Sequence, residues 1–365
     1  MNIAVMGFRG IPAKYGGFET FIEELAPRLA KKGHSVTVYG RSNIIKYRGR
    51  YYKGVRIIVL PTISHKYIDT VFHTFLCVLH ALFQRYDIIF ILNAANSIFS
   101  FLPRLTGKRV VVNVDGIERR RKKWSLIGKL WYLSGEFFSA IFPNRIVSDA
   151  RAIQDYYRRR YRKDSTFIPY GAYTTRVSSD EALKRFGIQS RGYILYISRL
   201  EPENNAHLVI KAFEKVKTDK TLVIVGDAPY ARKYVESLKK TKDKRIIFTG
   251  YVFGQGYREL QSHAYCYIHA TEVGGTHPAL IEAMGFGNCV IANGTPENIE
   301  VLGKCGLIYK RNDVEDLREK IRYVLNNPQI IHEYGERAQK RIGQQYNWDS
   351  IAHSYETLFR ETARR

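Results

Sequence analysis

The chain contains little cysteine and none of the spacings that usually mark a metal site. Its 365 residues include four cysteines, Cys77, Cys266, Cys289 and Cys305, which form no CxxC pair and have no histidine cluster beside them. Such usage is typical of a reducing compartment and argues against structural zinc. No convincing Asp-x-Asp pair follows an expected strand either. We therefore expect neither a metal nor a resident cofactor.

Two common nucleotide-binding fingerprints are also missing. The first expected strand runs into Gly7-Phe8-Arg9-Gly10 and then Gly16-Gly17, which is neither GxGxxG nor a P-loop. A nicotinamide-dependent oxidoreductase is therefore disfavoured. Glycines before a helix can still bring backbone amides close to an anion. Gly16 and Gly17 are candidates for a phosphate-binding turn, and a purely structural turn is the alternative.

No apolar run is long enough to cross a bilayer, and no leader segment is visible. The apolar stretch 68–83 is interrupted by Asp69, His73 and His80, and the stretch 88–102 is interrupted by asparagines and serines. A membrane-spanning helix needs about twenty consecutive apolar residues. The sequence therefore predicts a cytoplasmic protein that lies on a membrane rather than through it.

Acidic residues are scarce in the first half of the chain. Residues 1–170 contain 29 Lys and Arg against 11 Asp and Glu, whereas residues 171–365 contain 29 against 23. The total formal charge is +24. A field concentrated on one half attracts polyanions such as nucleic acid, anionic lipid or phosphorylated substrates. A well-solvated basic surface is the plainer interpretation.

One basic run is followed by an aromatic and apolar segment, which is typical of helices at a membrane interface. We predict that seven residues of this segment face an anionic membrane surface: Arg119, Arg120, Arg121, Lys122, Lys123, Trp124 and Trp131. A second basic run at 158–163 would add to the attraction. Nucleic-acid binding remains an alternative, although the chain has no recognisable RRM, KH, zinc-finger or helix-turn-helix pattern.

Short runs rich in Val and Ile, typical of parallel strands buried on both faces, alternate with amphipathic segments. The series occurs twice. Expected strands are 2–8, 35–40, 55–60, 87–92, 109–114 and 145–148, and then 193–198, 222–225, 246–249, 266–269, 289–292 and 307–309. This alternation predicts an α/β protein with two doubly wound parallel sheets. We expect Rossmann-like lobes at 1–172 and 173–345, and a terminal helix at 346–365 that packs back on the first lobe.

Polar residues that follow strands are the first candidates for a site, because ligands bind beside the carboxyl ends of strands in open α/β sheets. Arg199 follows strand 193–198, where a guanidinium could bind a diphosphate or simply form a surface ion pair. The segment 271–278 follows another strand and leads into a helix that carries Glu282. A carboxylate among apolar neighbours needs a partner, for which a ribose diol and a structural salt bridge are the two candidates.

The chain resembles family four, or group 1, of the retaining GT-B glycosyltransferases, particularly the bacterial branch that includes rhamnosyltransferases of capsule and O-antigen assembly. The resemblance is carried, in family order along the whole chain, by MGFRGIPAKYGGFET, NVDGIERRRKKW, VSDARAIQDYY, FIPYGA, SRLEPENN, EVGGTHPALIEAMGFG and YNWDSIAHSYETLF. It implies a GT-B fold with two lobes facing a central cleft. It also implies metal-independent transfer of a hexose or deoxyhexose, with retention of configuration, from a nucleotide-diphosphate sugar.

The implied acceptor is a lipid-linked saccharide or a polysaccharide, and the implied location is the inner face of the plasma membrane. No nucleic acid is implied as a partner. Position by position, Arg199 resembles the diphosphate-binding arginine, and Glu282 resembles the second carboxylate of a Glu-x7-Glu motif that binds the donor ribose. The loop of Gly274, Gly275, Thr276 and His277 resembles the family's donor-sugar loop. The pair Gly16 and Gly17 resembles the glycines beside the donor phosphates.

Several positions depart from the family pattern. Gly274 stands where the first glutamate of the motif is expected, and Glu272 is the carboxylate that could replace it. Asn204 stands where many relatives have a lysine, so another cation, such as Arg9 or Lys14, would have to meet the charge of the diphosphate.

Two features of the first lobe complete the comparison with the family. Asp115 resembles a polar residue of the catalytic cleft. The sequence Glu118-Arg119-Arg120 replaces the Glu-Trp-basic pattern of the rhamnosyltransferase branch, which leaves the transferred sugar open.

Overall fold

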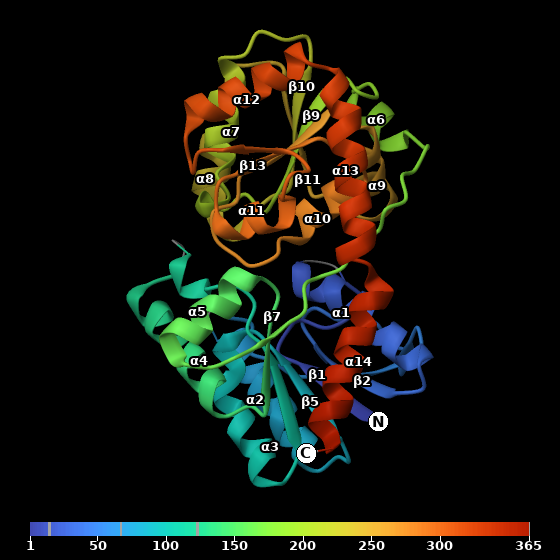
Figure 1. Ribbon diagram of the computed structural model, residues 1–365. Helices are drawn as coiled ribbons and strands as arrows, with labels where there is room; N and C mark the ends of the chain where they lie inside the picture. Colours follow the sequence, from blue (N-terminus) through green and yellow to red (C-terminus); the bar gives the residue numbers. More distant parts are fainter. Residues whose placement is uncertain (14–15, 66–67, 122–123, 365) are drawn as a thin grey trace. The chain divides into compact units, whose positions relative to one another are not determined.

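The computed structural model in Figure 1 describes residues 1–13, 16–65, 68–121 and 124–364. The chain divides into two compact units. The first unit comprises Met1–Arg120, Trp124–Tyr170 and Trp348–Arg365, and the second comprises Arg121–Lys123 and Gly171–Asn347. Each unit is built around one sheet, and each is described by itself below.

The first unit contains an eight-stranded sheet in the order β3-β4-β2-β1-β5-β6-β7-β8. Its strands are β1 (Asn2–Met6), β2 (Ser35–Arg41), β3 (Tyr51–Tyr52), β4 (Val55–Leu60), β5 (Ile88–Leu92), β6 (Arg109–Asn113), β7 (Arg145–Ser148) and β8 (Thr166–Phe167). All neighbours pair in parallel except β3 and β4. The five residues of β5 are wholly buried, as expected for a strand covered on both faces.

Helices cover both faces of this sheet. They are α1 (Gly17–Lys31), α2 (Asp69–Leu82), α3 (Phe101–Leu105), α4 (Leu126–Ile141), α5 (Arg151–Tyr161) and α14 (Trp348–Arg364). The last helix, α14, packs on α1, β5 and β6 within this unit. The Tyr355 ring of α14 lies 5.5 Å from Phe21 of α1 and 5.4 Å from Phe90 of β5, so an aromatic cluster joins the C-terminal helix to the first sheet.

The second unit contains a six-stranded parallel sheet in the order β11-β10-β9-β12-β13-β14. Its strands are β9 (Tyr193–Ile197), β10 (Thr221–Val225), β11 (Ile246–Gly250), β12 (Cys266–His269), β13 (Val290–Asn293) and β14 (Leu307–Tyr309). Its helices are α6 (Glu181–Phe186), α7 (Ala206–Glu214), α8 (Arg232–Leu238), α9 (Gly254–His263), α10 (Pro278–Gly285), α11 (Pro296–Leu302), α12 (Val314–Asn326) and α13 (Gln329–Gln345).

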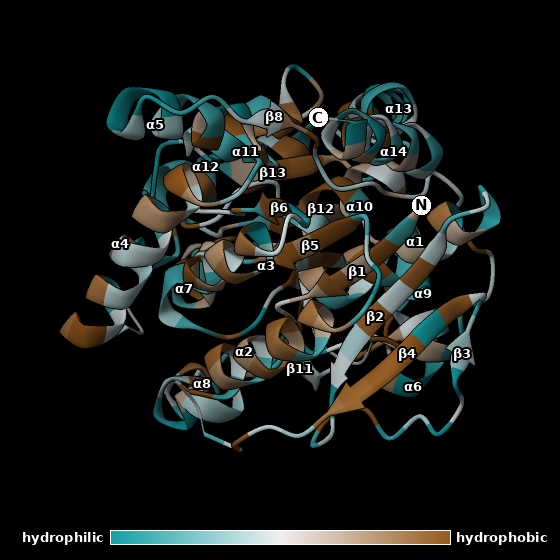
Figure 2. Ribbon diagram, turned by 90° about the horizontal axis from the view of Figure 1, so that it is seen from below, coloured by the Kyte–Doolittle hydropathy of each residue, from teal (hydrophilic) through white to brown (hydrophobic). Residues whose placement is uncertain are grey.

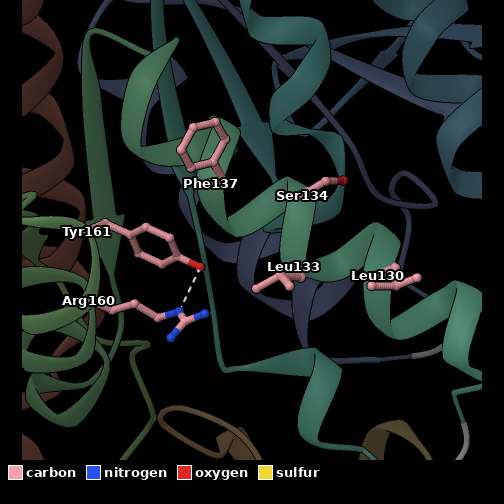
Figure 3. A pocket seen from close by; sticks show the side chains of 6 residues that line it. All are labelled: Leu130, Leu133, Ser134, Phe137, Arg160 and Tyr161. Atoms are coloured by element: carbon pink, nitrogen blue, oxygen red, sulfur yellow. Dashed lines mark hydrogen bonds between the residues drawn. The ribbon is translucent and has the colours of Figure 1, made fainter.

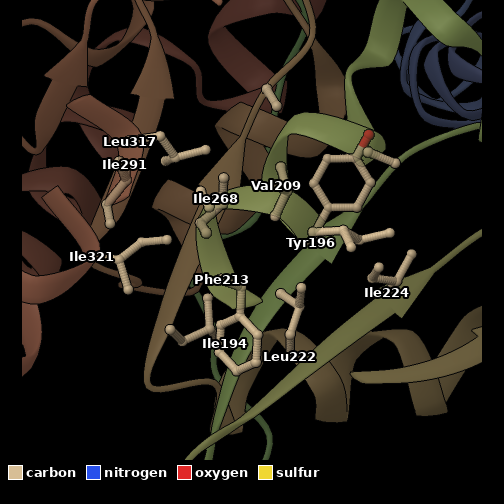
Figure 4. Packing of buried hydrophobic residues seen from close by; sticks show 14 of the residues in the cluster. Ile194, Tyr196, Val209, Phe213, Leu222, Ile224, Ile268, Ile291, Leu317 and Ile321 are labelled. Atoms are coloured by element: carbon tan, nitrogen blue, oxygen red, sulfur yellow. The ribbon is translucent and has the colours of Figure 1, made fainter. Parts of the chain in front are cut away.

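The helices of the second unit form two layers, with α7, α8 and α12 on one side of its sheet and α9 and α13 on the other (Figure 1). The first layer seals a core in which Phe213 packs among side chains of β9, β10 and β12 (Figure 4). The predicted pair of parallel α/β sheets is confirmed. All twelve expected strands are present, whereas the two-residue edge strands β3 and β8 were not expected.

Candidate functional site

Neighbouring parallel strands bring several polar residues to one edge of the second sheet. β9 pairs with β12, β12 with β13, and β13 with β14, and all four run in the same direction. The segments that follow them therefore lie side by side at their carboxyl ends. These segments carry the predicted Arg199 and Glu272. They also carry three asparagines that were not predicted from the sequence, namely Asn205, Asn293 and Asn312.

Arg199 lies two residues beyond β9 in a tightly hydrogen-bonded turn. Its side chain is 36% exposed and its Nη1 lies 3.9 Å from Glu201 Oε1. The Asn204 side-chain amide donates to the Arg199 carbonyl at 2.6 Å, and the Tyr196 hydroxyl donates to the Asn204 carbonyl at 2.6 Å. Asn204 thus shapes the turn that presents Arg199. Direct contact of Asn204 with a donor stays a prediction.

Arg121 corrects the membrane-facing prediction. This residue belongs to the second unit and is only 6% exposed. Its Nη1 lies 3.7 Å from Glu203 Oε1 and 3.9 Å from Glu201 Oε2. Glu203 is fully buried, and such a carboxylate is stable only beside a cation. The prediction that Arg121 faces a membrane is therefore wrong.

The loop before α10 is built around His277. A β-carbon on Gly274 would lie 2.3 Å from Cε1 of His277, so only glycine allows the imidazole to pack there. The His277 ring also lies 4.9 Å from that of His269. Burial, then His269, and then the charges of Arg121 and Arg199 hold the pKa of His277 well below its usual value. His277 is thus neutral at pH 7, and the loop can bind a ligand through its backbone and a neutral ring.

Glu272 takes part in a network of asparagines at this edge. Asn312 donates its side-chain amide to Glu272, and its Oδ1 accepts hydrogen bonds of 2.9 Å from both Asn205 and Asn293. Asn205 and Asn293 also donate to the Ala270 carbonyl. None of the three asparagines was predicted from the sequence, although Asn293 ends β13 and Asn312 closely follows β14. The network fixes Glu272, and its role toward a donor stays a prediction.

Glu282 has the partner that its position in α10 requires. The hydroxyl of Tyr257, on α9, donates to Glu282 Oε2 at 2.5 Å. The Tyr267 hydroxyl donates to the Ile197 carbonyl at 3.3 Å, and the charge of Glu282 contributes to raising the pKa of Tyr267, after burial. Tyr267 therefore lies between the end of β9, which leads to Arg199, and the carboxylate of α10.

In the first unit, the glycine-rich turn is fixed by carboxylates of α1. Gly16 precedes α1 with φ of 96°, and a β-carbon there would lie 2.6 Å from Glu19 Oε2. The backbone amide of Arg9 donates to Glu19 at 3.2 Å, and that of Ala13 donates to Glu23 at 2.7 Å. Burial raises the pKa of Glu19, against the opposing charge of Arg9. Gly17 begins the helix, and Lys14 lies outside the described residues.

Asp115 follows β6 in the left-handed region, with φ of 51°. Two hydrogen bonds hold Asp115 in place. Its backbone N–H donates to the Asn113 side-chain oxygen at 3.0 Å, and the Tyr170 hydroxyl donates to its carboxylate at 3.3 Å. Burial and the nearby carboxylate raise the pKa of Tyr170 well above its usual value, so it remains a donor. Asp115 is thus held in one orientation, and its catalytic role stays a prediction.

The other members of the predicted membrane-facing set differ in exposure. Arg119 is 28% exposed and binds the buried Glu136 at 3.1 Å, whereas Arg120 is exposed. Trp124 is half-buried with its ring 4.9 Å from Tyr132. Trp131 is also half-buried, and Lys122 and Lys123 lie outside the described residues.

The described part of the chain contains no group of three or more His, Cys, Asp or Glu side chains placed to hold a metal ion. Independence from metal nevertheless stays a prediction. No helix in the described ranges has the length and apolar character that a bilayer crossing requires.

Two family models match the two units in turn. Residues 178–341, which include Arg199 and Glu282, match the model described as "Glycosyl transferases group 1". Residues 1–173 match the model described as "Domain of unknown function (DUF1972)". The second unit therefore carries a group 1 glycosyltransferase domain. This family match lies on the same unit as the residues that follow β9, β12, β13 and β14.

Known proteins agree with this assignment. An uncharacterized glycosyltransferase of Methanocaldococcus jannaschii is 23% identical over 252 residues, which cover 64% of this chain and 60% of that protein. The chain therefore spans less than two thirds of that relative's length.

Solved structures match over nearly the whole chain. Sucrose-phosphate synthase from Thermosynechococcus elongatus matches with a TM-score of 0.85 and 18% identity, covering 99% of this chain and 98% of that one. HepE from Anabaena, solved in complex with UDP-glucose, matches with a TM-score of 0.80 and 17% identity over 98% and 99% of the two chains. These likenesses confirm the predicted GT-B fold. The rhamnosyltransferase branch stays a prediction.

Proposed function

We propose that this protein transfers a hexose or deoxyhexose, with rhamnose one candidate, from a nucleotide-diphosphate donor to a lipid-linked or polysaccharide acceptor. The transfer retains configuration, needs no divalent metal and serves cell-surface polysaccharide synthesis. The observation that carries the proposal is the strand-edge site of the group 1 domain. There Arg199, the loop at Gly274 and the Tyr257-bound Glu282 follow β9 and β12.

Each residue of this site has a proposed part in donor binding. Arg199 binds the diphosphate and stabilises the negative charge that grows as it leaves. Glu282 accepts hydrogen bonds from the ribose, and the loop from Gly274 to His277 holds the sugar with backbone groups. Arg121 contributes to the positive potential that the missing lysine at Asn204 would otherwise supply, because its charge reaches His277 as that of Arg199 does.

The proposed reaction is a front-face displacement. The bond from the anomeric carbon to the diphosphate oxygen breaks, the bond to the acceptor oxygen forms on the same face, and the acceptor proton moves to the departing phosphate. Asp115 orients the acceptor or the sugar, and Gly16 and Gly17 lie beside the phosphates. These three roles rest on the family resemblance.

The acceptor side is proposed to work at an anionic membrane, on the inner face of the plasma membrane. Support comes from the exposed apolar residues of α4, which include Leu126 and Ile127 at 73% and 80% exposure. Figure 2 shows hydrophobic residues along α4 and at its end. The membrane-facing surface is thus proposed to be the outer face of α4 rather than the buried Arg121.

A thermal-shift panel of UDP-, dTDP- and GDP-sugars tests the donor. One nucleotide class should raise the unfolding midpoint. Glu282→Gln should weaken the binding of that ligand and so reduce the shift, whereas Glu333→Gln, on the exposed face of α13, should not. Arg199→Ala should lower turnover by about 10²–10³-fold, the usual loss when a preorganised charge is removed from a leaving group. Absence of any nucleotide shift, or normal turnover of Arg199→Ala, would refute the proposal.

A further inference from the structure

A groove lies between α4 and the end of α5 in the first unit. It has a volume of about 360 Å³ and is lined by Leu130, Leu133, Ser134, Phe137, Arg160 and Tyr161. Figure 3 shows the four α4 side chains along one wall, with Arg160 and Tyr161 from α5 opposite them. Apolar surface therefore dominates the groove, and one guanidinium stands at its edge. This combination suits an amphiphile with an apolar chain and an anionic head.

The α5 wall of the groove is held in place by a buried carboxylate. The Tyr161 hydroxyl donates to Glu136 Oε2 at 3.1 Å, and the Tyr156 hydroxyl donates to the same oxygen at 2.7 Å. The Arg160 Nε donates to the Tyr161 hydroxyl at 3.3 Å, and its guanidinium lies 5.6 Å from the Tyr161 ring centre. Arg160 is thus oriented through Nε, and its two terminal nitrogens can meet an anion bidentately.

The apolar surface does not stop at the groove. Leu130 and Phe137 line it, and they also belong to a stripe of α4 residues that are about half or more exposed, namely Leu126, Ile127, Leu130, Phe137 and Ile141. These positions recur at helical spacing along 16 residues, a length of about 24 Å. One bound chain covers only the groove. Covering the whole stripe requires an extended apolar phase, which a bilayer provides.

Charge beside the groove selects the head group. Arg159, Arg160 and Arg162, at the end of α5, are all exposed, and Lys129 is exposed on α4. Arg158 is different, because Asp164 binds it at 2.8 Å. Cations that border an apolar stripe favour an anionic leaflet over a neutral one.

We propose that the groove binds one acyl chain of an anionic phospholipid, with the lipid phosphate on Arg160, and that this site fixes α4 along the membrane surface. The inference rests on the proposed membrane-bound acceptor and is independent of the donor chemistry. Tyr161 and the leucines form the chain-binding walls, and Arg160 distinguishes an anionic head from a neutral one.

Monomeric short-chain lipid tests the groove apart from general adsorption to a bilayer. Dihexanoyl-phosphatidylglycerol below its critical micelle concentration should bind in calorimetry more tightly than dihexanoyl-phosphatidylcholine, and inorganic phosphate should not bind. Arg160→Gln should lower the affinity for the anionic lipid about tenfold or more, as expected for losing a charged hydrogen-bond partner. The matched control Arg159→Gln makes the same charge change one residue away, outside the groove, and should lower that affinity by less than about twofold.

The apolar wall has its own pair of variants. Phe137→Ser should weaken binding of the short-chain lipid. Leu126→Ser, which is on the stripe but outside the groove, should leave that binding unchanged. On phosphatidylglycerol vesicles, Arg159→Gln and Leu126→Ser should both reduce binding, because the whole surface contacts the bilayer. Phe137 and Leu126 are exposed, so neither change threatens folding.

Several outcomes would overturn the inference. These are equal losses for Arg160→Gln and Arg159→Gln, equal binding of both head groups, or vesicle binding without any binding of monomeric lipid. A lipid-free dimer that Leu130→Ser dissociates would show instead that a second copy covers the stripe. The nucleotide thermal shift separates this inference from the proposed function, because Arg160→Gln should leave that shift unchanged.

Discussion

Tyr257 donates a hydrogen bond of 2.5 Å to the carboxylate of Glu282, and the two residues belong to different helices of the second unit. Burial, followed by the charge of Glu282, raises the pKa of Tyr257 well above its usual value, so the phenol keeps its proton and remains a donor. Gln261 donates in turn to the Tyr257 hydroxyl at 3.2 Å. The Glu282 carboxylate, which we propose binds the ribose, is therefore oriented by a neighbouring helix.

Tyr257→Phe should weaken binding of the nucleotide sugar about tenfold while the protein stays folded. The change removes one hydrogen bond to a charged group, which is worth roughly 1.5–3 kcal/mol, and so weakens the constraint on the orientation of Glu282. Calorimetric titration of the donor measures the loss directly.

Tyr265→Phe is the control for this prediction. The Tyr265 hydroxyl also donates a partly buried hydrogen bond, to the Val324 carbonyl at 3.2 Å, but Tyr265 precedes β12 and so lies at the opposite end of that strand from the site. Donor affinity should survive this change. If both variants bound the donor normally, Tyr257 would have no role in orienting Glu282.

Substitutions of Asn312 should lower the stability of the second unit by an amount that depends on the new residue. Asn312→Ala removes hydrogen bonds to Glu272, Asn205 and Asn293 and places alanine at φ of 59°, so the second unit should lose about 3 kcal/mol or more of stability. Asn312→Gly loses the same bonds but has no β-carbon, and should recover about 1 kcal/mol. Thermal unfolding compares them, and equal midpoints would contradict a backbone contribution.

The strands and their order of appearance were predictable because Val and Ile runs report burial on both faces of a sheet. The two-residue strands β3 and β8 were not, since two residues carry no periodicity. Arg199 and Glu282 were singled out as candidates from their places after β9 and inside α10, and their roles toward a donor stay predictions. The partner of Glu282 was missed because Tyr257 precedes it by 25 residues and meets it only through helix packing.

The basic run was the weakest part of the prediction. A run of like charges usually lies in solvent, but the structure buries Arg121 beside Glu203, a carboxylate 82 positions later in the sequence. Local composition cannot report such pairing. The asparagine network, in contrast, left a signal, since Asn293 ends β13 and Asn312 follows β14.

Arg119 is expected to stabilise the first unit rather than to bind lipid. Arg119→Ala removes the cation beside Glu136, which is 4% exposed, and should lower the free energy of unfolding by roughly 2 kcal/mol. Arg159→Ala, an exposed cation of α5, should leave the unfolding midpoint unchanged and reduce binding to anionic vesicles. The reverse pattern would return Arg119 to the membrane-facing set.

Acid should destabilise the second unit more steeply than the first. Burial lowers the pKa of His269 to about 3 and holds that of His277 well below its usual value, whereas the first unit contributes His73, with a pKa of about 4. These rings bind fewer protons when folded than when unfolded, so stability is full above pH 6.5 and falls below it. Each contributes a slope of about 1.4 kcal/mol per pH unit.

His269→Phe isolates this effect, because phenylalanine keeps the buried ring and removes the titration. Between pH 6.5 and 5.5, the part of the fall in unfolding free energy of the second unit that is due to histidine should be about half as large in this variant. Urea unfolding, followed separately for the two units, measures this fall. His332→Asn, on the exposed side of α13, should keep the full decline. An unchanged slope in His269→Phe would mean that folding does not lower the pKa of His269, and the neutral state of the His269–His277 pair would be refuted.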